Sequence, residues 1–81
     1  MIVNLLLFAA AKEIAGSNQL ELSLEKPFTV GRLKTALVSE CPELAALTKR
    51  SAFSVDQAYA NDQTEIGPHA EVAMIPPVSG G

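Results

Sequence analysis

The hydrophobic positions of the chain recur with two different periods. Residues 2–9 are almost continuously apolar, which is typical of a strand buried in the middle of a sheet. Residues 20–24 alternate leucine with polar side chains, and residues 53–56 also alternate, so both stretches predict half-buried strands. Another apolar run, over residues 71–75, predicts the last strand. Because the first and last runs are the most apolar, we expect them to lie at the centre of the sheet as parallel neighbours.

The helical period is clearest between Thr29 and Pro42. Apolar side chains recur there at helical spacing, at Val30, Leu33, Leu37 and Cys41. Thr29 is a residue type that caps the start of a helix, and a helix usually ends before a proline such as Pro42. This stretch therefore predicts one long helix.

Two shorter helical segments flank these elements. Residues 9–15 are rich in helix formers and are followed by Gly16, a typical C-cap, so they predict one or two helical turns. Residues 43–47 predict a further short turn of helix. Turn signals at residues 61–62 and 67–68 leave room for a short strand between them.

The order of these elements predicts an α+β fold, a mixed sheet with one long helix across one face. One set of side chains is then expected to face the helix: Val3, Leu5, Leu7, Val72 and Met74. Leu6, Phe8 and Ile75 fall on the uncovered face, where an exposed apolar patch often marks a partner site. Neither a repeat nor a linker divides the sequence, so we expect residues 1–81 to form a single domain.

Composition narrows the possible functions. The chain has 81 residues, 48% of them hydrophobic, and a formal net charge of -3 without a basic run, which argues against nucleic acid as the partner. One cysteine, Cys41, and one histidine, His69, can form neither an intrachain disulfide nor a metal cluster. We interpret Cys41 as a packing residue of the helix and His69 as a loop residue. The apolar start is too short to span a bilayer, so we expect a soluble cytoplasmic protein.

The last six residues are Pro76-Pro77-Val78-Ser79-Gly80-Gly81. Two prolines favour an extended exit from the preceding strand, and two glycines leave the terminal carboxylate unobstructed. Six extended residues reach roughly 20 Å, so this tail can carry the carboxylate of Gly81 deep into another protein. A frayed terminus is the alternative interpretation.

Taken together, these segments resemble a known family. The resemblance lies in four segments: Leu5-Leu6-Leu7-Phe8-Ala9, Ala11-Lys12-Glu13-Ile14-Ala15-Gly16, Glu71-Val72-Ala73-Met74-Ile75 and the tail of residues 76–81. The chain is similar over its whole length to the small, sulfur-carrier subunit of molybdopterin synthase, within the ubiquitin-like β-grasp group. The family often has Ala-Val-Asn in its third strand, and here Ser54-Val55-Asp56 departs from that pattern.

The resemblance implies a specific chemistry for the tail. An adenylating, E1-like activating enzyme would use ATP and Mg²⁺ to activate the Gly81 carboxylate, and a sulfur donor would convert it to a thiocarboxylate. The large subunit would then bind cyclic pyranopterin monophosphate and receive this sulfur, forming molybdopterin for the molybdenum cofactor. The chain would be a co-substrate that binds no cofactor, with the catalytic side chains on its partners. The resemblance also implies a heterotetramer, with two small subunits on a dimer of large ones.

The residues expected to contact the large subunit are Leu6, Phe8, Tyr59 and Ile75. Three of them also have a structural interpretation, since Phe8 and Ile75 can be core residues and Tyr59 can belong to a hairpin. Two other functions stay open at this point. The chain can be a sulfur carrier for another product, such as thiamin or thiolated tRNA. It can also be a ubiquitin-like protein modifier whose Gly81 forms isopeptide bonds with lysines.

Overall fold

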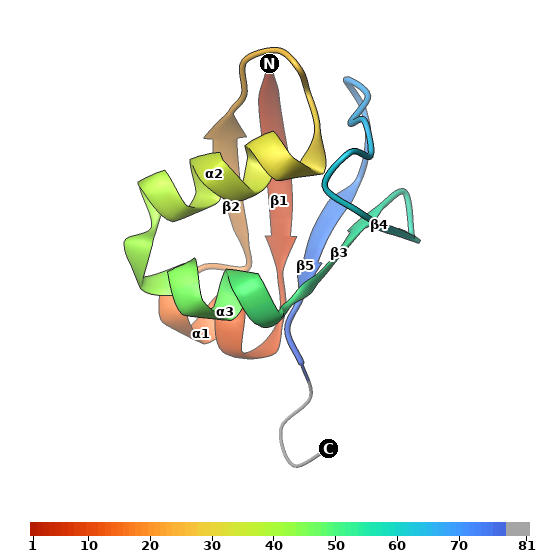
Figure 1. Ribbon diagram of the computed structural model, residues 1–81. Helices are drawn as coiled ribbons and strands as arrows, with labels where there is room; N and C mark the ends of the chain where they lie inside the picture. The colour runs from red at the N-terminus through yellow and green to blue at the C-terminus, as the bar shows by residue number, and fades with distance from the viewer. Residues whose placement is uncertain (78–81) are drawn as a thin grey trace.

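The computed structural model describes residues 1–77, and it consists of a five-stranded mixed sheet with helices on one face (Figure 1). In chain order the elements are β1 (Ile2–Leu7), α1 (Ala9–Ala15), β2 (Gln19–Ser23), α2 (Val30–Glu40), the 3₁₀ helix η1 (Pro42–Leu44), α3 (Ala45–Arg50), β3 (Ala52–Val55), β4 (Ala58–Ala60) and β5 (Val72–Ile75). The predicted α+β class is therefore confirmed. The helix predicted across the sheet is α2, and η1 and α3 extend the same layer.

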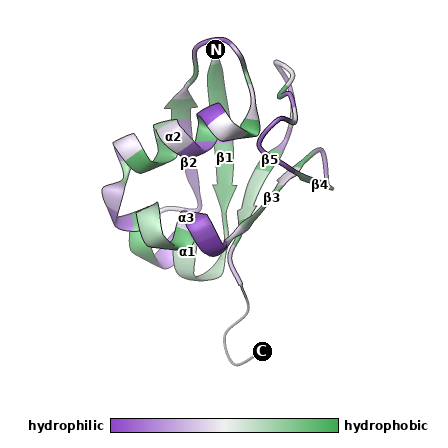
Figure 2. Ribbon diagram, viewed as in Figure 1, coloured by the Kyte–Doolittle hydropathy of each residue, from purple (hydrophilic) through white to green (hydrophobic). Residues whose placement is uncertain are grey.

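The sheet has the strand order β2-β1-β5-β3-β4. β1 and β5 pair in parallel, and the other neighbours pair antiparallel. The prediction that the first and last apolar runs are parallel neighbours is confirmed, with β5 at the centre of the sheet. Figure 2 shows these two strands as hydrophobic over most of their length, which agrees with strands that have neighbours on both sides. β5 ends at the same end of the sheet as α1 (Figure 1).

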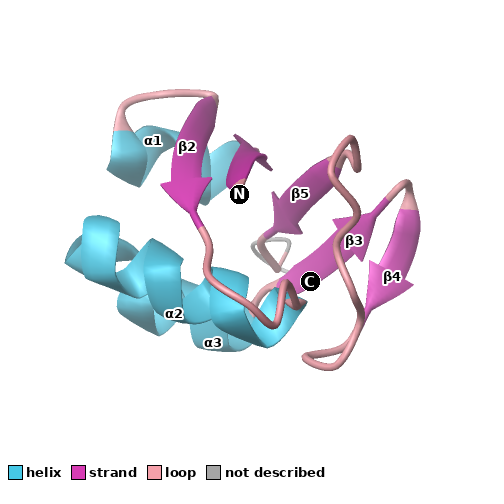
Figure 3. Ribbon diagram, turned by 90° about the horizontal axis from the view of Figure 1, so that it is seen from above, coloured by secondary structure: helices cyan, strands magenta, loops and turns pink. Residues whose placement is uncertain are grey.

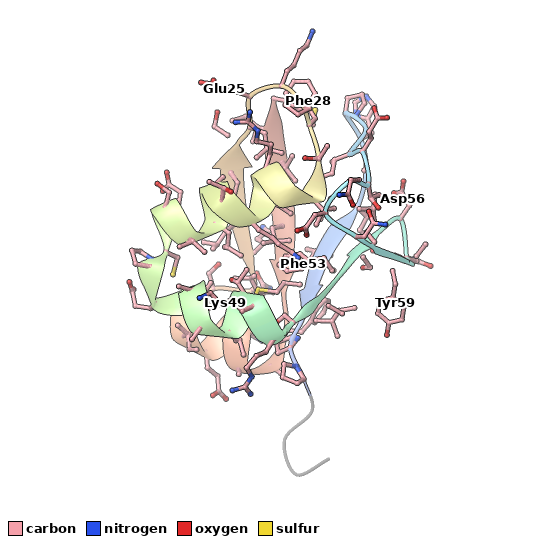
Figure 4. All side chains as sticks on the ribbon, in the orientation of Figure 1. Glu25, Phe28, Lys49, Phe53, Asp56 and Tyr59 are labelled. Atoms are coloured by element: carbon pink, nitrogen blue, oxygen red, sulfur yellow. The ribbon has the colours of Figure 1, made fainter. Side chains whose placement is uncertain are left out.

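The core lies between the sheet and the helix layer, which Figure 3 shows on one side of the strands. All five side chains predicted to face the helix are buried: Val3, Leu5, Leu7, Val72 and Met74. α2 contributes Val30, Leu33 and Leu37, each 0% exposed. Phe53 of β3 lies between the two layers (Figure 4). Cys41 is half-buried and packs against this core, as predicted for a packing residue.

The loop of residues 61–66 caps the N-terminus of α2. The backbone N–H of Val30 donates to the carbonyl of Thr64 over 3.0 Å, and that of Gly31 donates to the carbonyl of Asp62 over 2.9 Å. The Arg32 N–H donates to the hydroxyl of Thr29 over 3.3 Å, which confirms the predicted cap. The first N–H groups of a helix have no partner within the helix, so this loop and Thr29 together satisfy three of them.

The same loop corrects one prediction. The short strand expected between residues 61–62 and 67–68 is wrong, because that stretch forms only a single bridge, from Glu65 to Thr29. The fourth strand lies earlier, at β4. A two-residue turn joins β3 to β4, with φ of 51° at Asp56 and 69° at Gln57, as tight hairpins require. Aspartate tolerates this conformation well, so Asp56 serves the turn in place of asparagine.

The short helices also differ in detail from the sequence prediction. α1 matches its predicted bounds, and Gly16 ends it in the left-handed conformation with a φ of 74°. The helical turn predicted over residues 43–47 instead continues to Arg50 as η1 and α3. Thr48 is buried, and its hydroxyl donates to the carbonyl of Leu44 over 2.8 Å, which lets a polar side chain enter the core.

Stability should depend on the apolar side of α2. Leu37 is 0% exposed, so replacing it with alanine leaves a cavity, and we expect Leu37→Ala to lower the free energy of unfolding by about 2–5 kcal/mol. Ser39→Ala, on the exposed side of the same helix, should change it by less than about 0.5 kcal/mol. Urea unfolding of both variants measures the difference. Equal losses would contradict the assignment of Leu37 to the core.

Candidate functional site

The tail begins at the end of β5, the central strand. Pro76 is buried and Pro77 is exposed. The other predicted tail residues, Val78, Ser79, Gly80 and Gly81, lie outside the described residues. The part of the candidate site that the structure describes is therefore the root of the tail and the sheet face beside it.

The strand register brings Leu6 and Tyr59 onto one face of the sheet. Tyr59 of β4 pairs with Ser54 of β3, Ser54 pairs with Ala73 of β5, and Ala73 pairs with Leu6 of β1. Directly paired residues share a face, so these four form one row across four strands. Phe53, the neighbour of Ser54, points to the helices, so this row lies on the uncovered face. Figure 4 shows Tyr59 projecting away from Phe53.

Ile75 and Phe8 form a second row on this face, next to the root of the tail. Ile75 pairs with Ala52 of β3. Leu7 pairs with Met74, so Phe8, the next residue of an extended backbone, comes beside Ile75. The Phe8 side chain is 50% exposed and that of Tyr59 is 79% exposed, whereas Leu6 and Ile75 are half-buried. The structure thus brings all four predicted partner residues together on one surface.

A strained residue presents Phe8 at this position. Ala9, the first residue of α1, has a φ of 50°, which lies in the left-handed region that residues with a Cβ seldom adopt. This conformation costs about 1–2 kcal/mol and turns the chain from β1 into α1 within one residue. Phe8 itself stays extended, with φ −128° and ψ 157°, so it continues the strand direction beyond Leu7. The sequence gives no signal of this strain, because alanine here reads only as a helix former.

Sequence reasoning missed Ile2, which belongs to the same face. Ile2 is 59% exposed, and along β1 it alternates with the buried Val3 in the same way as Asn4 and Leu6. The two-residue period of the strand would have found it. The amide of Asn4 donates to the side-chain oxygen of Gln19 over 2.9 Å on this face.

The other candidates of the sequence do not join this surface. Cys41 follows α2, in the helix layer, and His69 is exposed in the loop before β5. Over residues 1–77, no group of three or more His, Cys, Asp or Glu side chains gathers closely enough to hold a metal ion. None of the helices in the same residues is both long and apolar enough to cross a membrane.

A matched pair of aromatic side chains tests which face is covered. Phe53 and Tyr59 lie on neighbouring strands, and they are 2% and 79% exposed. We expect Phe53→Ala to lower the free energy of unfolding by about 3–5 kcal/mol. Tyr59→Ala should lower it by less than about 1 kcal/mol, because little of its surface is buried by the fold. Chemical denaturation of both variants is the measurement, and a Tyr59 variant as unstable as the Phe53 variant would show that Tyr59 belongs to the core.

The chain is similar in sequence to a family of known proteins. The family model described as the ThiS family matches residues 5–81. The molybdopterin synthase sulfur carrier subunit of Homo sapiens is 33% identical, over 98% of this chain and 93% of that protein. The protein of the same name from Chlamydomonas reinhardtii is 31% identical, over 100% of both chains.

Solved structures share the fold. The crystal structure of small archaeal modifier protein 1 from Haloferax volcanii superposes with a TM-score of 0.89 at 27% identity, over 100% of both chains. The complex of subunits 1 and 2 of the molybdopterin-converting factor from Helicobacter pylori contains a chain that matches with a TM-score of 0.68 at 21% identity, again over 100% of both chains. These likenesses confirm the ubiquitin-like β-grasp fold predicted from the sequence.

Proposed function

The chain belongs to the ThiS family, and from that premise we propose that it is the sulfur-carrier subunit of molybdopterin synthase. The observation that carries the proposal is the sequence Pro-Pro-Val-Ser-Gly-Gly directly after β5, at the centre of the sheet and inside the matched region. Relatives of about 30% identity named as molybdopterin synthase sulfur carrier subunits support the same assignment.

The proposed reactive group is the carboxylate of Gly81. A carboxylate is a poor electrophile, so an activating enzyme first joins it to the α-phosphate of ATP with Mg²⁺ and releases pyrophosphate. Hydrosulfide from a sulfur donor then attacks the acyl carbon, the bond between that carbon and AMP breaks, AMP leaves, and a thiocarboxylate forms. This sulfur is a nucleophile that needs no cysteine on the chain, and we propose that it passes to cyclic pyranopterin monophosphate in the large subunit. We expect this chemistry in the cytoplasm, where ATP is available.

In the proposed chemistry, this chain holds the start of the tail in a fixed place relative to the surface that the partner binds. β5 is paired on both sides, by β1 and β3, and Pro76 is buried, so the starting point of the tail is fixed relative to the sheet. The five residues from Pro77 to Gly81 can span at most roughly 18 Å. A partner that docks on the uncovered face can therefore receive the Gly81 carboxylate only within that distance of the end of β5. This limit is the reason why the tail length should matter.

We propose that the large subunit docks on the uncovered face. The residues assigned to the contact are Leu6, Phe8, Tyr59 and Ile75, which the strand register places on that face. The Helicobacter pylori neighbour is a complex of subunits 1 and 2 of the molybdopterin-converting factor, which supports a two-subunit assembly for this chain as well. The heterotetramer implied by the family resemblance is part of this proposal.

One observation favours a second function. The Haloferax volcanii structure, with its TM-score of 0.89, is named a small archaeal modifier protein. A modifier would use the same activated Gly81, but the acyl carbon would be attacked by a lysine amine instead of by a sulfur donor. Co-purification of a pterin-binding large subunit would favour the carrier, and lysine conjugates would favour the modifier.

Changing the length of the tail should abolish activation. Deleting Gly81 withdraws the carboxylate by roughly 3.5 Å. A misplacement of about 1 Å can already cost about a hundredfold in rate, so we expect at least that loss of thiocarboxylate formation. Ser79→Ala keeps the length and should stay within about threefold of the wild type, because no reacting atom moves. Mass spectrometry after incubation with the activating enzyme, ATP and a sulfur donor detects exchange of one oxygen for sulfur. Normal loading of the shortened chain would refute the assignment of Gly81.

Docking should depend on the apolar surface next to the tail. Phe8→Asp places a charge on this surface, and we expect it to weaken binding to the large subunit by at least about 2 kcal/mol, as for a central interface residue. Ala46→Asp adds the same charge on the exposed side of α3, in the helix layer, and should leave the affinity unchanged. Calorimetric titration gives both values. If the two variants bind equally well, Phe8 is not an interface residue.

A further inference from the structure

The uncovered face carries acidic residues at the end opposite the tail. Glu21 of β2 pairs with Asn4 of β1. Asn4 precedes Leu5, which pairs with Val72, so Glu71 comes beside Asn4 in the same register. Glu21 and Glu71 therefore flank Asn4 on one line across the sheet.

Asp56 extends this line to the turn between β3 and β4. Its backbone N–H donates to the carbonyl of Glu71 over 2.7 Å, and its Oδ1 accepts from the N–H of Glu71 over 2.9 Å. We call Glu21, Asp56 and Glu71 the acidic row. All three are exposed, and within residues 1–77 none of them forms an ion pair.

Positive charge is absent from the strands. Across the five strands that the structure describes, no residue is Lys, Arg or His. The basic residues lie on helices or on the loop before α2, at Lys12, Lys26, Arg32, Lys34, Lys49 and Arg50. The basic residues therefore lie off the strands, and one of them, Lys12, lies beside Leu6 and Phe8 at the tail end of the sheet. The helices carry carboxylates as well, such as Glu40 and Glu43, whereas the acidic row has no cation on the strands around it.

The distance between the acidic row and the apolar residues follows from strand geometry. Asn4 and Leu6 are two residues apart on β1, which corresponds to roughly 7 Å. Phe8 lies two residues further, roughly 13 Å from Asn4. The face thus consists of an apolar half at the tail and an acidic row at the other end, a few strand residues away.

We propose that the acidic row orients the partner on this face by pairing with a set of Lys and Arg side chains on the large subunit. This inference rests on the proposed function. It predicts that the contact surface of the large subunit has an apolar centre with basic residues roughly 7–13 Å to one side. Docking in the reversed direction would set these cations over Phe8 and leave the carboxylates unpaired. Only one orientation of the partner pairs the opposite charges, and this orientation determines at which end of the partner the tail enters.

Electrostatics of this kind acts on encounter and orientation more than on final affinity. Exposed charge pairs at the rim of an interface raise the association rate and exclude wrong orientations, while they add little to the binding free energy. An anionic membrane or nucleic acid would be repelled by the same row. The acidic row therefore fits a basic protein surface.

The test reverses the charges in two places. In the full chain, Glu21→Lys with Glu71→Lys changes the acidic row, and Glu40→Lys with Glu43→Lys changes exposed residues of α2 and η1 by the same total charge. Association with the purified large subunit is followed by stopped-flow fluorescence at about 0.05 M and 0.5 M salt. Thermal melts confirm that both double variants fold.

We expect the acidic-row variant to associate about tenfold more slowly at low salt, and to approach the wild-type rate at high salt, where charges are screened. The helix-layer variant should stay within about threefold at both salt concentrations. Equal slowing of both variants would show that only net charge matters, and it would overturn the proposal. Unchanged association of the acidic-row variant would also overturn it.

Measurements on the wild-type chain distinguish a failure of this inference from a failure of the proposed function on which it rests. If the wild type gains sulfur and binds the large subunit while the acidic-row variant behaves like its control, the inference alone fails. If the wild type neither gains sulfur nor binds the large subunit, the proposed function fails, and the inference fails with it.

Discussion

The parallel pairing of β1 with β5 is the interaction on which the rest of the structure depends. It joins the first strand of the chain to the last one, in the register Leu5 to Val72 and Leu7 to Met74. This register buries those four side chains under the helices and leaves Leu6 beside Ala73 on the other face. It also makes β5 a central strand, hydrogen-bonded on both sides. A strand held in this way cannot fray easily, so the chain that leaves it starts from a fixed point.

Much of this arrangement follows from local sequence signals. The apolar stripe of α2 and its Thr29 cap are strong and local, and both are present in the structure. A hairpin at Tyr59 was one interpretation of the sequence, but the bounds of β4 could not be predicted, because Ala58, Tyr59 and Ala60 give a period-two pattern too short to recognise. The loop of residues 61–66 follows a path that lets its carbonyls accept hydrogen bonds from the first N–H groups of α2. These groups are distant in sequence, so local propensity could not predict the path of the loop.

The position of Leu6, Phe8 and Ile75 on the uncovered face was predictable from strand alternation, whereas Ile2 was missed and the position of Tyr59 depends on the strand register. Period-two alternation separates Leu6 from its buried neighbours, yet only the register shows that Tyr59 shares its row through Ser54 and Ala73. A slip of one residue in any strand pair would send those side chains to the core, and register depends on the whole sheet. The strained φ of Ala9 likewise arises from the junction of β1 with α1. The role proposed for Gly81 rests on the sequence and on the family match.

A carrier that visits two enzymes in turn has to bind each of them and then leave. A large apolar interface would slow dissociation, since differences in affinity appear mostly in the off-rate. This sheet face exposes only a few large apolar side chains, such as Phe8 and Tyr59, and its remaining positions include small and acidic residues. Charge raises the rate of encounter without adding much to residence time. In the proposed complex, a small apolar half with an acidic row beside it would combine rapid, oriented docking with ready release. That balance suits the proposed carrier, whose one reactive group would be loaded at one enzyme and discharged at another.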